Sequence, residues 1–268
     1  MQGLTEFVPV SSTAHLILAP RFLGIAVPAH PHTYDTVIQA GTLLPVLFFF
    51  RAEWLRLIGA ALTVARRRSL GDDHYERLLP CLAVGTLPAL LAGALLHSRV
   101  AELGEPDNPW AFLVIGAALI VVALAMIGAE RTMRNGRAES AVTVGDAWRI
   151  GIAQAVALIP GVSRSGATIT AGMFAGLSRE AAARFSFMLM TPVMVAATAF
   201  GVLKLLRSPE PVAPDEWRSL LLAMAVAAVV GYFAIAVLLR FLRQNTLYWF
   251  VGYRLALGGW LIYLHFAG

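Results

Sequence analysis

The sequence is poor in charged residues and nearly free of cysteine. Of its 268 residues, 14% are Asp, Glu, Lys or Arg and 58% are hydrophobic, whereas a soluble domain carries about 25% charged residues. The single thiol, Cys81, can form neither an internal disulfide nor a cysteine-based metal site. These shortages argue against a water-soluble globular domain and exclude a secreted scaffold held together by disulfides.

Long apolar runs take the place of charge. Crossing a bilayer requires about 20 helical residues, because the hydrocarbon core is about 30 Å thick. Six stretches reach that length, near residues 37–57, 78–97, 110–128, 185–206, 219–242 and 247–266. Arg51 and Glu53 interrupt the first stretch and should mark its interfacial end. The sequence therefore predicts an all-α polytopic membrane protein, in which residues 1–268 form a single integral membrane domain with six transmembrane helices.

The basic residues are distributed unevenly among the loops. The net charge of +5 would suggest a nucleic-acid partner in a soluble protein. Here the Arg excess lies in loops 58–77 and 129–146, whereas loops 98–109 and 207–218 carry several acidic side chains. This alternation predicts that the Arg-rich loops face the cytoplasm and the acidic loops face outward, and it predicts no nucleic-acid partner.

A polar phrase occurs twice in this apolar sequence, at residues 2–15 and at residues 154–168. A shift of 152 residues aligns four pairs: Gln2 with Gln154, Val10 with Val162, Ser11 with Ser163 and Thr13 with Ser165. Polar side chains at membrane depth are costly, which makes them candidates for function. The duplication indicates that the two halves build one site together.

The positions of the two phrases predict an inverted repeat. Three spans lie between the phrases and three follow the second one, so the halves, about 1–128 and 147–268, should have opposite orientations. Each phrase also contains a proline, which prevents a continuous helix. We therefore expect two re-entrant helix–loop–helix hairpins, at about 1–24 and 147–177, whose tips meet near the midplane.

The second phrase has the composition of an anion-binding turn. Pro160 to Gly166 form a short Gly- and Ser-containing segment ahead of an apolar helix, and backbone N–H groups at such a turn can hold an anion. Ser163 and Ser165 add hydroxyl donors. Arg164 adds a planar guanidinium suited to phosphate.

The first phrase offers a carboxylate, a hydroxyl and an imidazole. A carboxylate facing an anion-binding turn would repel the ligand unless a cation lies between them. Glu6 and Gln2, four residues apart, are therefore a candidate oxygen-ligand pair for Mg²⁺ or Ca²⁺. Ser12 and His15, three residues apart, supply a nucleophile and a base. We favour Ser12 as the nucleophile with His15 as its base, and direct attack by His15 is the alternative.

Both phrases together resemble the motifs of a known family, the bacterial undecaprenyl pyrophosphate phosphatases linked to bacitracin resistance. The family's first motif is Glu or Gln, a Glu four residues later, Pro-Val-Ser-Ser-Thr and a His. It corresponds here to Gln2, Glu6, Pro9 to Thr13 and His15. The second motif, Pro-Gly-x-Ser-Arg-Ser-x-x-Thr, is matched at every fixed position from Pro160 to Thr168.

The resemblance implies a multi-pass hydrolase of the bacterial inner membrane. It would remove the terminal phosphate from undecaprenyl pyrophosphate, a C55 isoprenyl lipid, in a site open to the periplasm, and so recycle the carrier for cell-wall synthesis and give bacitracin resistance. The resemblance also implies Ser12 or His15 as nucleophile, Glu6 as metal or base partner and Arg164 on the pyrophosphate. The candidate pyrophosphate-binding residues are Ser11, Gly161, Ser163, Arg164, Ser165 and Thr168.

Two other functions fit the pattern less well. A transporter or flippase for an anionic lipid would also use inverted repeats with broken helices, but binding alone does not require Glu6 with Ser12 and His15. A second class of lipid phosphatase needs a histidine downstream of its Ser-Arg pair, and none follows Arg164 as far as Ser178. The sequence leaves open whether the protein is a homodimer.

Some polar residues are expected to have only structural roles. Thr170 should bond back to the carbonyl four residues earlier, as Ser and Thr in membrane helices often do. Glu180 and Arg184, four residues apart, should form an ordinary ion pair on one helix.

Overall fold

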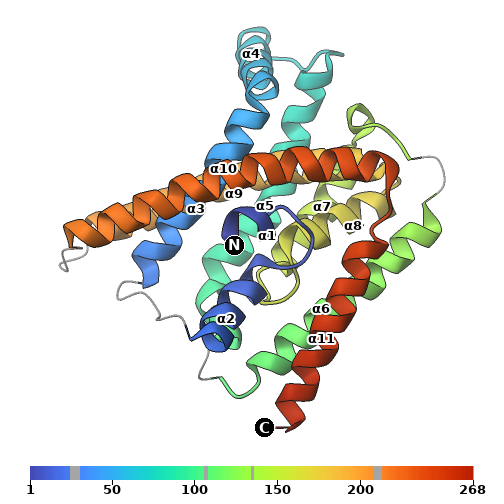
Figure 1. Cartoon of the computed structure of the whole chain (residues 1–268). Helices are drawn as coiled ribbons and strands as arrows, with labels where there is room; N and C mark the ends of the chain where they lie inside the picture. Colours follow the sequence, from blue (N-terminus) through green and yellow to red (C-terminus); the bar gives the residue numbers. More distant parts are fainter. Residues whose placement is uncertain (25–30, 106–107, 134–135, 208–212, 268) are drawn as a thin grey trace.

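The computed structural model describes residues 1–24, 31–105, 108–133, 136–207 and 213–267. In these ranges the chain is folded almost entirely into helices (Figure 1). The α-helices are α1 (Gln2–Thr5), α2 (Ser12–Leu23), α3 (Pro31–Phe49), α4 (Arg51–Arg67), α5 (His74–Ala101), α6 (Ala111–Thr132), α7 (Val144–Val156), α8 (Arg164–Phe174), α9 (Arg179–Leu206), α10 (Pro214–Gln244) and α11 (Tyr248–Ala267). Two 3₁₀ turns, η1 (Glu102–Gly104) and η2 (Glu139–Ala141), complete the described helical structure.

Four of these helices are long and apolar enough to cross a bilayer. They are α5, over His74–Leu96, and α6, α9 and α10 over their full lengths. The prediction of an all-α polytopic membrane protein is confirmed by these helices. Helix α3 has a shorter apolar stretch over Thr36–Phe49, and the 20-residue α11 carries a charged residue, Arg254, in its interior.

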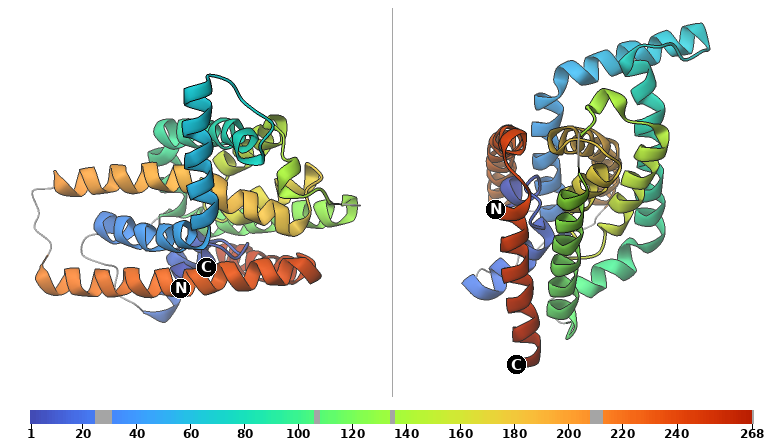
Figure 2. Two further views of the ribbon diagram at one scale, coloured as in Figure 1. Left: turned by 90° about the horizontal axis from the view of Figure 1, so that it is seen from above. Right: turned by 90° about the vertical axis from the view of Figure 1, so that its right-hand side faces the viewer.

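The first predicted span is wrong in its extent. A single helix over residues 37–57 was expected, but α3 ends at Phe49 and α4 begins at Arg51. Phe50 separates them with φ −96° and ψ 23°, and α4 then turns away from the direction of α3 (Figure 2). A straight continuation would have carried the charges of Arg51 and Glu53 along the path of an apolar span, which is costly.

Helix α9 connects most of the bundle. It packs against α3, α5, α8 and α10, and all residues from 185 to 191 are buried. The ring of Phe7, in the turn after α1, meets the ring of Phe187 edge to face, with centroids 5.6 Å apart and an interplanar angle of 85°. Burial of these apolar side chains anchors the first turn to the core of the protein.

Each short hairpin packs against a long helix from the opposite half of the chain. Helix α1 lies on α10, and α7 lies on α5. The contacts are made through small residues: Gly3 faces the Ala227 carbonyl and Gly151 faces the Gly85 carbonyl, so closely that a side chain at either glycine would collide with backbone. Small residues at such contacts let membrane helices approach closely. They let α1 and α7 pack closely against α10 and α5.

Helices α6 and α11 cross in a symmetric manner. A Cβ atom at Gly116 would lie 2.8 Å from the Gly258 carbonyl oxygen, and a Cβ atom at Gly258 would lie 2.8 Å from the Gly116 carbonyl oxygen. The next neighbours also correspond, with Leu261 above Gly116 and Leu119 above Gly258. The contacts on the two helices at this crossing point thus mirror each other.

Ion pairs join the helix ends near α4. They show that the predicted pair of Glu180 with Arg184 is wrong. Glu180 and Arg184 do not pair with each other. The Arg184 guanidinium donates to Glu53 at 2.6 Å and to Glu139 at 2.8 Å, whereas Glu180 accepts from Arg243 at 2.7 Å. Burial raises the pKa of the Glu139 carboxyl, and the positive charge of Arg184 opposes that rise. Arg184 pairs with carboxylates from α4 and η2 and not with Glu180 on its own helix, because the fold brings two acceptors to its guanidinium.

Candidate active site

The two polar turns have the same unusual backbone. Ser11 has φ 75° and ψ 96°, and Ser163 has φ 71° and ψ 116°, in a region that residues other than glycine seldom adopt. Each serine caps the helix that follows: the Oγ atom of Ser11 accepts the N–H of Ala14 at 3.3 Å, and that of Ser163 accepts the N–H of Gly166 at 3.1 Å. The predicted correspondence of these two serines thus extends to their conformation.

Both turns lead into helix N-termini whose first N–H groups are free. In the described structure the first two N–H groups of α2 and of α8, those of Ser12, Thr13, Arg164 and Ser165, have no hydrogen-bond partner. Unpaired N–H groups at a helix start carry partial positive charge and attract anions. Gly161 is required in the second turn because it has φ 93° and lies against the backbone of Ile115.

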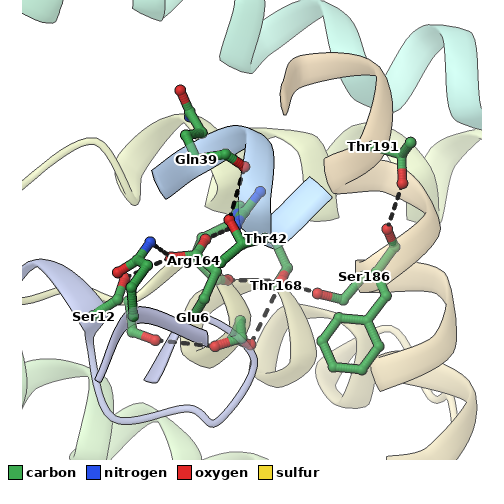
Figure 3. A network of polar contacts seen from close by, with 12 residues as sticks. Glu6, Ser12, Gln39, Thr42, Arg164, Thr168, Ser186 and Thr191 are labelled. Atoms are coloured by element: carbon green, nitrogen blue, oxygen red, sulfur yellow. Dashed lines mark hydrogen bonds and ion pairs between the residues drawn. The ribbon is translucent and has the colours of Figure 1, made fainter. Parts of the chain in front are cut away.

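Direct contacts join the two turns. The Ser165 hydroxyl donates to the Val8 carbonyl at 3.2 Å. Arg164, at the start of α8, forms an ion pair with Glu6 in the turn after α1 (Figure 3). Their side chains are 17% and 12% exposed, respectively, so the pair lies mostly out of water, where ion pairs are weakly screened.

Glu6 is the centre of the polar network. One carboxylate oxygen accepts from the Arg164 guanidinium, and the other accepts from the Ser12 hydroxyl at 2.7 Å (Figure 3). The second oxygen also accepts from the Gln2 amide at 2.9 Å. A hydroxyl that donates to a carboxylate at this distance is oriented for proton transfer. The Ser12 hydroxyl is therefore hydrogen-bonded to a carboxylate.

The spacing predicted His15 as the partner of the Ser12 hydroxyl, but the hydrogen bonds of His15 lead elsewhere. The described hydrogen bonds of His15 join its Nδ1 atom to the Ser11 carbonyl at 2.7 Å and its Nε2 atom to the Tyr253 hydroxyl at 2.5 Å. The expected contact between Ser12 and His15 is not formed. Ser12 is the first residue of α2 and points back to Glu6, whereas His15 lies one turn further and faces α11.

Arg254 is a site residue that the sequence analysis missed. Its side chain is fully buried in the protein, at 0% exposure, and its guanidinium donates to backbone carbonyls of both turns and of α6. The acceptors are Pro9 at 3.2 Å, Gly161 at 3.1 Å, Val162 at 2.9 Å, Leu119 at 3.2 Å and Ala118 at 3.5 Å. An arginine inside the apolar run 247–266 was the available signal, because a charge there usually marks function.

The remaining candidates divide between the turn and the core. The hydroxyls of Ser163 and Ser165 lie 3.2 Å apart. Thr168 is turned toward α9: its hydroxyl lies 2.5 Å from that of Ser186 and donates to the Arg164 carbonyl at 2.7 Å (Figure 3). Thr170 donates to the Gly166 carbonyl at 2.6 Å, which confirms its predicted structural role.

The oxygen atoms around Glu6 suit a divalent cation in part. The Gln2 Oε1 atom is buried and has no hydrogen-bond partner, and an oxygen of this kind can serve as a ligand for Mg²⁺ or Ca²⁺. Glu6 supplies the carboxylate, although both of its oxygens already accept hydrogen bonds. Within the described residues no group of three His, Cys, Asp or Glu side chains is placed to hold a metal ion. Gln2 and Glu6 could thus contribute ligands but would need others.

Comparison with known proteins gives a consistent result. The family model described as bacitracin resistance protein BacA matches residues 1–260. An undecaprenyl-diphosphatase of Anaeromyxobacter sp. (strain K) is 44% identical over 271 residues, which covers 100% of this chain and 89% of that protein. Proteins of the same name from Gemmatimonas aurantiaca and Syntrophobacter fumaroxidans are 40% and 39% identical; the matches cover 96% and 99% of this chain and 92% and 95% of those proteins.

Proposed function

The chain belongs to the bacitracin resistance protein BacA family, and from this membership we infer that it is an undecaprenyl-diphosphatase of the membrane. It removes the terminal phosphate of undecaprenyl pyrophosphate and leaves undecaprenyl phosphate and inorganic phosphate. The family connects this reaction to reuse of the lipid carrier in cell-wall synthesis and to bacitracin resistance. The substrate is a membrane lipid, so its polyprenyl chain can stay in the bilayer while its head group enters the site.

We propose that Ser12 is the nucleophile and Glu6 its general base. The observation that carries this assignment is the 2.7 Å bond from the Ser12 hydroxyl to the Glu6 carboxylate. As Ser12 Oγ forms a bond to the terminal phosphorus, the bond from phosphorus to the bridging oxygen breaks, and undecaprenyl phosphate leaves. Glu6 takes the serine proton. Water then cleaves the phosphoserine, and the proton returns to Ser12 Oγ.

Arg164 is proposed to bind the pyrophosphate. Its guanidinium has a second edge beyond the contact with Glu6, and a planar fork suits phosphate oxygens. The starts of α2 and α8 add free N–H groups, and the buried guanidinium of Arg254 donates to carbonyls of both turns. These positive groups would stabilise charge on the phosphoryl group as it transfers.

A divalent cation is proposed at Glu6 and Gln2. Two phosphates and a carboxylate carry more negative charge than Arg164 alone can balance, and a bound Mg²⁺ or Ca²⁺ would supply the missing positive charge. The unpartnered Gln2 Oε1 atom supports this location. Gln2 would have to turn its amide, because its nitrogen now donates to Glu6.

The membrane layout is proposed from the same features. Helices α3 and α11 would complete six spans, and the hairpins α1–α2 and α7–α8 would enter from opposite faces as parts of inverted repeats. The shared geometry of Ser11 and Ser163 and the symmetric crossing of α6 and α11 support the repeat. The uneven loop charges support Arg-rich loops on the cytoplasmic side and acidic loops outside, and a site that opens to the periplasm is proposed from the family resemblance.

Phosphate release from undecaprenyl pyrophosphate in detergent tests the function. The wild type should release phosphate, and Ser12→Ala should retain about 1% of the rate or less, since the nucleophile is lost. Ser69→Ala, at an exposed serine in the turn after α4, is the matched control and should keep the wild-type rate. Full activity in Ser12→Ala would remove Ser12 from the reaction. Absence of phosphate release by the wild type would contradict the assigned activity.

A further inference from the structure

Helix α4 has an apolar stripe that the described part of the chain leaves uncovered. Leu55, Ile58 and Leu62 are spaced three and four residues apart, which places them on one face of the helix, and they are 69%, 57% and 55% exposed. A different face contains the buried Leu57 and Ala60, and α4 packs against α5 and α3. These contacts leave the stripe free to meet a partner.

Helix α4 does not belong to the apolar spans. It has 17 residues and is not among the described helices that are long and apolar enough to cross a bilayer. Figure 1 shows α4 nearly end-on, whereas α3 and α5 are seen from the side. Figure 2 shows α4 lengthwise, projecting beyond the ends of these two helices. The stripe therefore lies on a helix at one end of the bundle that points in a different direction from its neighbours.

The free charge of α4 is positive. Its acidic residue, Glu53, is bound by the Arg184 guanidinium of α9 at 2.6 Å. Arg66 follows Leu62 by four residues, on the side of the stripe, and Arg68 is the C-cap of the helix. Both arginines are exposed, and neither has a partner among the described residues. The other arginines of the helix have partners within the protein: Arg51, Arg56 and Arg67. The stripe thus ends beside two guanidinium groups that are available to an anion.

We propose that α4 lies in the interface of the bilayer and binds anionic phospholipids. Its three apolar side chains enter the boundary between head groups and acyl chains, and its two free guanidinium groups bind head-group phosphates. A surface without net charge would satisfy the stripe but not the arginines. The proposed orientation places α4 on the cytoplasmic side, where the leaflet has a negative surface potential. This contact is separate from the hydrolysis reaction and involves no covalent step.

Quenching of a single fluorophore by labelled lipids tests the proposal. In a Cys81→Ser background, Ala65→Cys places a dye three residues after Leu62, at an exposed position, and leaves the apolar stripe intact. The full-length protein is reconstituted in phosphatidylcholine vesicles that contain increasing amounts of spin-labelled phosphatidylglycerol or spin-labelled phosphatidylcholine. The anionic lipid should reach half-maximal quenching at an about fivefold lower mole fraction, which corresponds to the attraction of one arginine for an anionic surface.

Two arginine variants show whether the free charges cause this preference. Replacing Arg66→Gln and Arg68→Gln together removes both charges without breaking a described contact of the fold, so the preference should fall to about twofold or less. The matched control, Arg99→Gln with Arg207→Gln, changes two exposed arginines of the acidic loops and should keep the fivefold preference. A dye at Val121→Cys, on the exposed side of α6, should be quenched equally by the two lipids.

Three outcomes would overturn the proposal. Equal quenching of the dye at position 65 by both lipids would mean that the helix does not select anionic head groups. A preference that survives the loss of Arg66 and Arg68 would separate it from these charges. Absence of quenching by either lipid would place the stripe outside the bilayer, and an oxidative cross-link between unlabelled Ala65→Cys chains would assign it to a second copy of the protein. Because no arm of the experiment measures hydrolysis, its result is independent of the proposed function.

Discussion

Replacing Arg254 with lysine should destabilise the protein and disorder its two turns together. The guanidinium is fully buried and donates to five backbone carbonyls, of which two belong to α6 and three to the turns. Lysine keeps the charge but concentrates it at one point, and an ammonium group has only three donors. It cannot reach acceptors that lie in three separate segments.

The size of the effect follows from the acceptors that lose their partner. The carbonyls of Ala118 and Leu119 lie inside α6 and also accept helical N–H groups. The loss therefore falls on the turn carbonyls of Pro9, Gly161 and Val162, of which an ammonium that cannot reach both turns leaves at least one unsatisfied. One buried acceptor without a partner costs about 1–3 kcal/mol. At about 2 °C per kcal/mol for a chain of this size, the unfolding midpoint should fall by roughly 2–6 °C.

The protein carries its own probe for this measurement. Cys81 is the single cysteine of the sequence and is 2% exposed in the folded state, so a thiol-reactive dye should label it only as the protein unfolds. Arg218→Lys is the matched control, because the Arg218 side chain is 83% exposed, and its midpoint should stay within about 1 °C of the wild type. An equally small shift for Arg254→Lys, with undiminished activity, would refute the role of Arg254 as the link between the turns.

Three further predictions concern the ligand site and the topology. Arg164→Lys should lose at least about 10²-fold in rate, because lysine cannot hold phosphate with a planar fork. If the variant kept most of its activity, Arg164 would have a structural role instead. Turnover should stop in excess EDTA, and Gln2→Glu should raise the apparent affinity for Mg²⁺ or Ca²⁺ by adding a carboxylate ligand; activity undiminished by chelator would exclude the metal. In a Cys81→Ser background, a cysteine at Ala101 should react with an impermeant maleimide on intact cells, and one at Ser69 only after permeabilisation; the reverse pattern would invert the proposed orientation.

Local sequence features predicted the turns well. Each phrase combines a proline with serines ahead of an apolar run, and the structure makes both into a turn followed by a helix capped by Ser11 or Ser163. The shift of 152 residues also anticipated that these serines correspond. Such features are local, since proline and a capping serine act on the next few residues.

Features that depend on distant partners were not predictable from spacing. Ser12 and His15 are three residues apart, but His15 is hydrogen-bonded to the hydroxyl of Tyr253, 238 residues away, and Ser12 to the nearer Glu6. Glu180 and Arg184 have ideal helical spacing, yet each finds a partner on another element. A local pair on a helix contributes only about 0.2–0.5 kcal/mol, which a tertiary ion pair that is partly buried can exceed.

Arg254 was overlooked for a different reason. Hydropathy treats residues 247–266 as an apolar run, and one charge among many apolar residues does not change that average. Its importance follows only from its carbonyl partners in the two turns and α6. The break after Phe49 is similar, because the charges of Arg51 and Glu53 were visible in the sequence but the direction taken by α4 depends on its packing against α5.

Trapping the covalent intermediate tests the central assignment, Ser12 as nucleophile with Glu6 as base. Rapid quenching after mixing with undecaprenyl pyrophosphate labelled in its terminal phosphate should leave label on the protein. The expected product is an acid-stable phosphoserine in the peptide that contains Ser12, absent from Ser12→Ala. An acid-labile, base-stable phosphoramidate at His15 would contradict this assignment and make the imidazole the nucleophile.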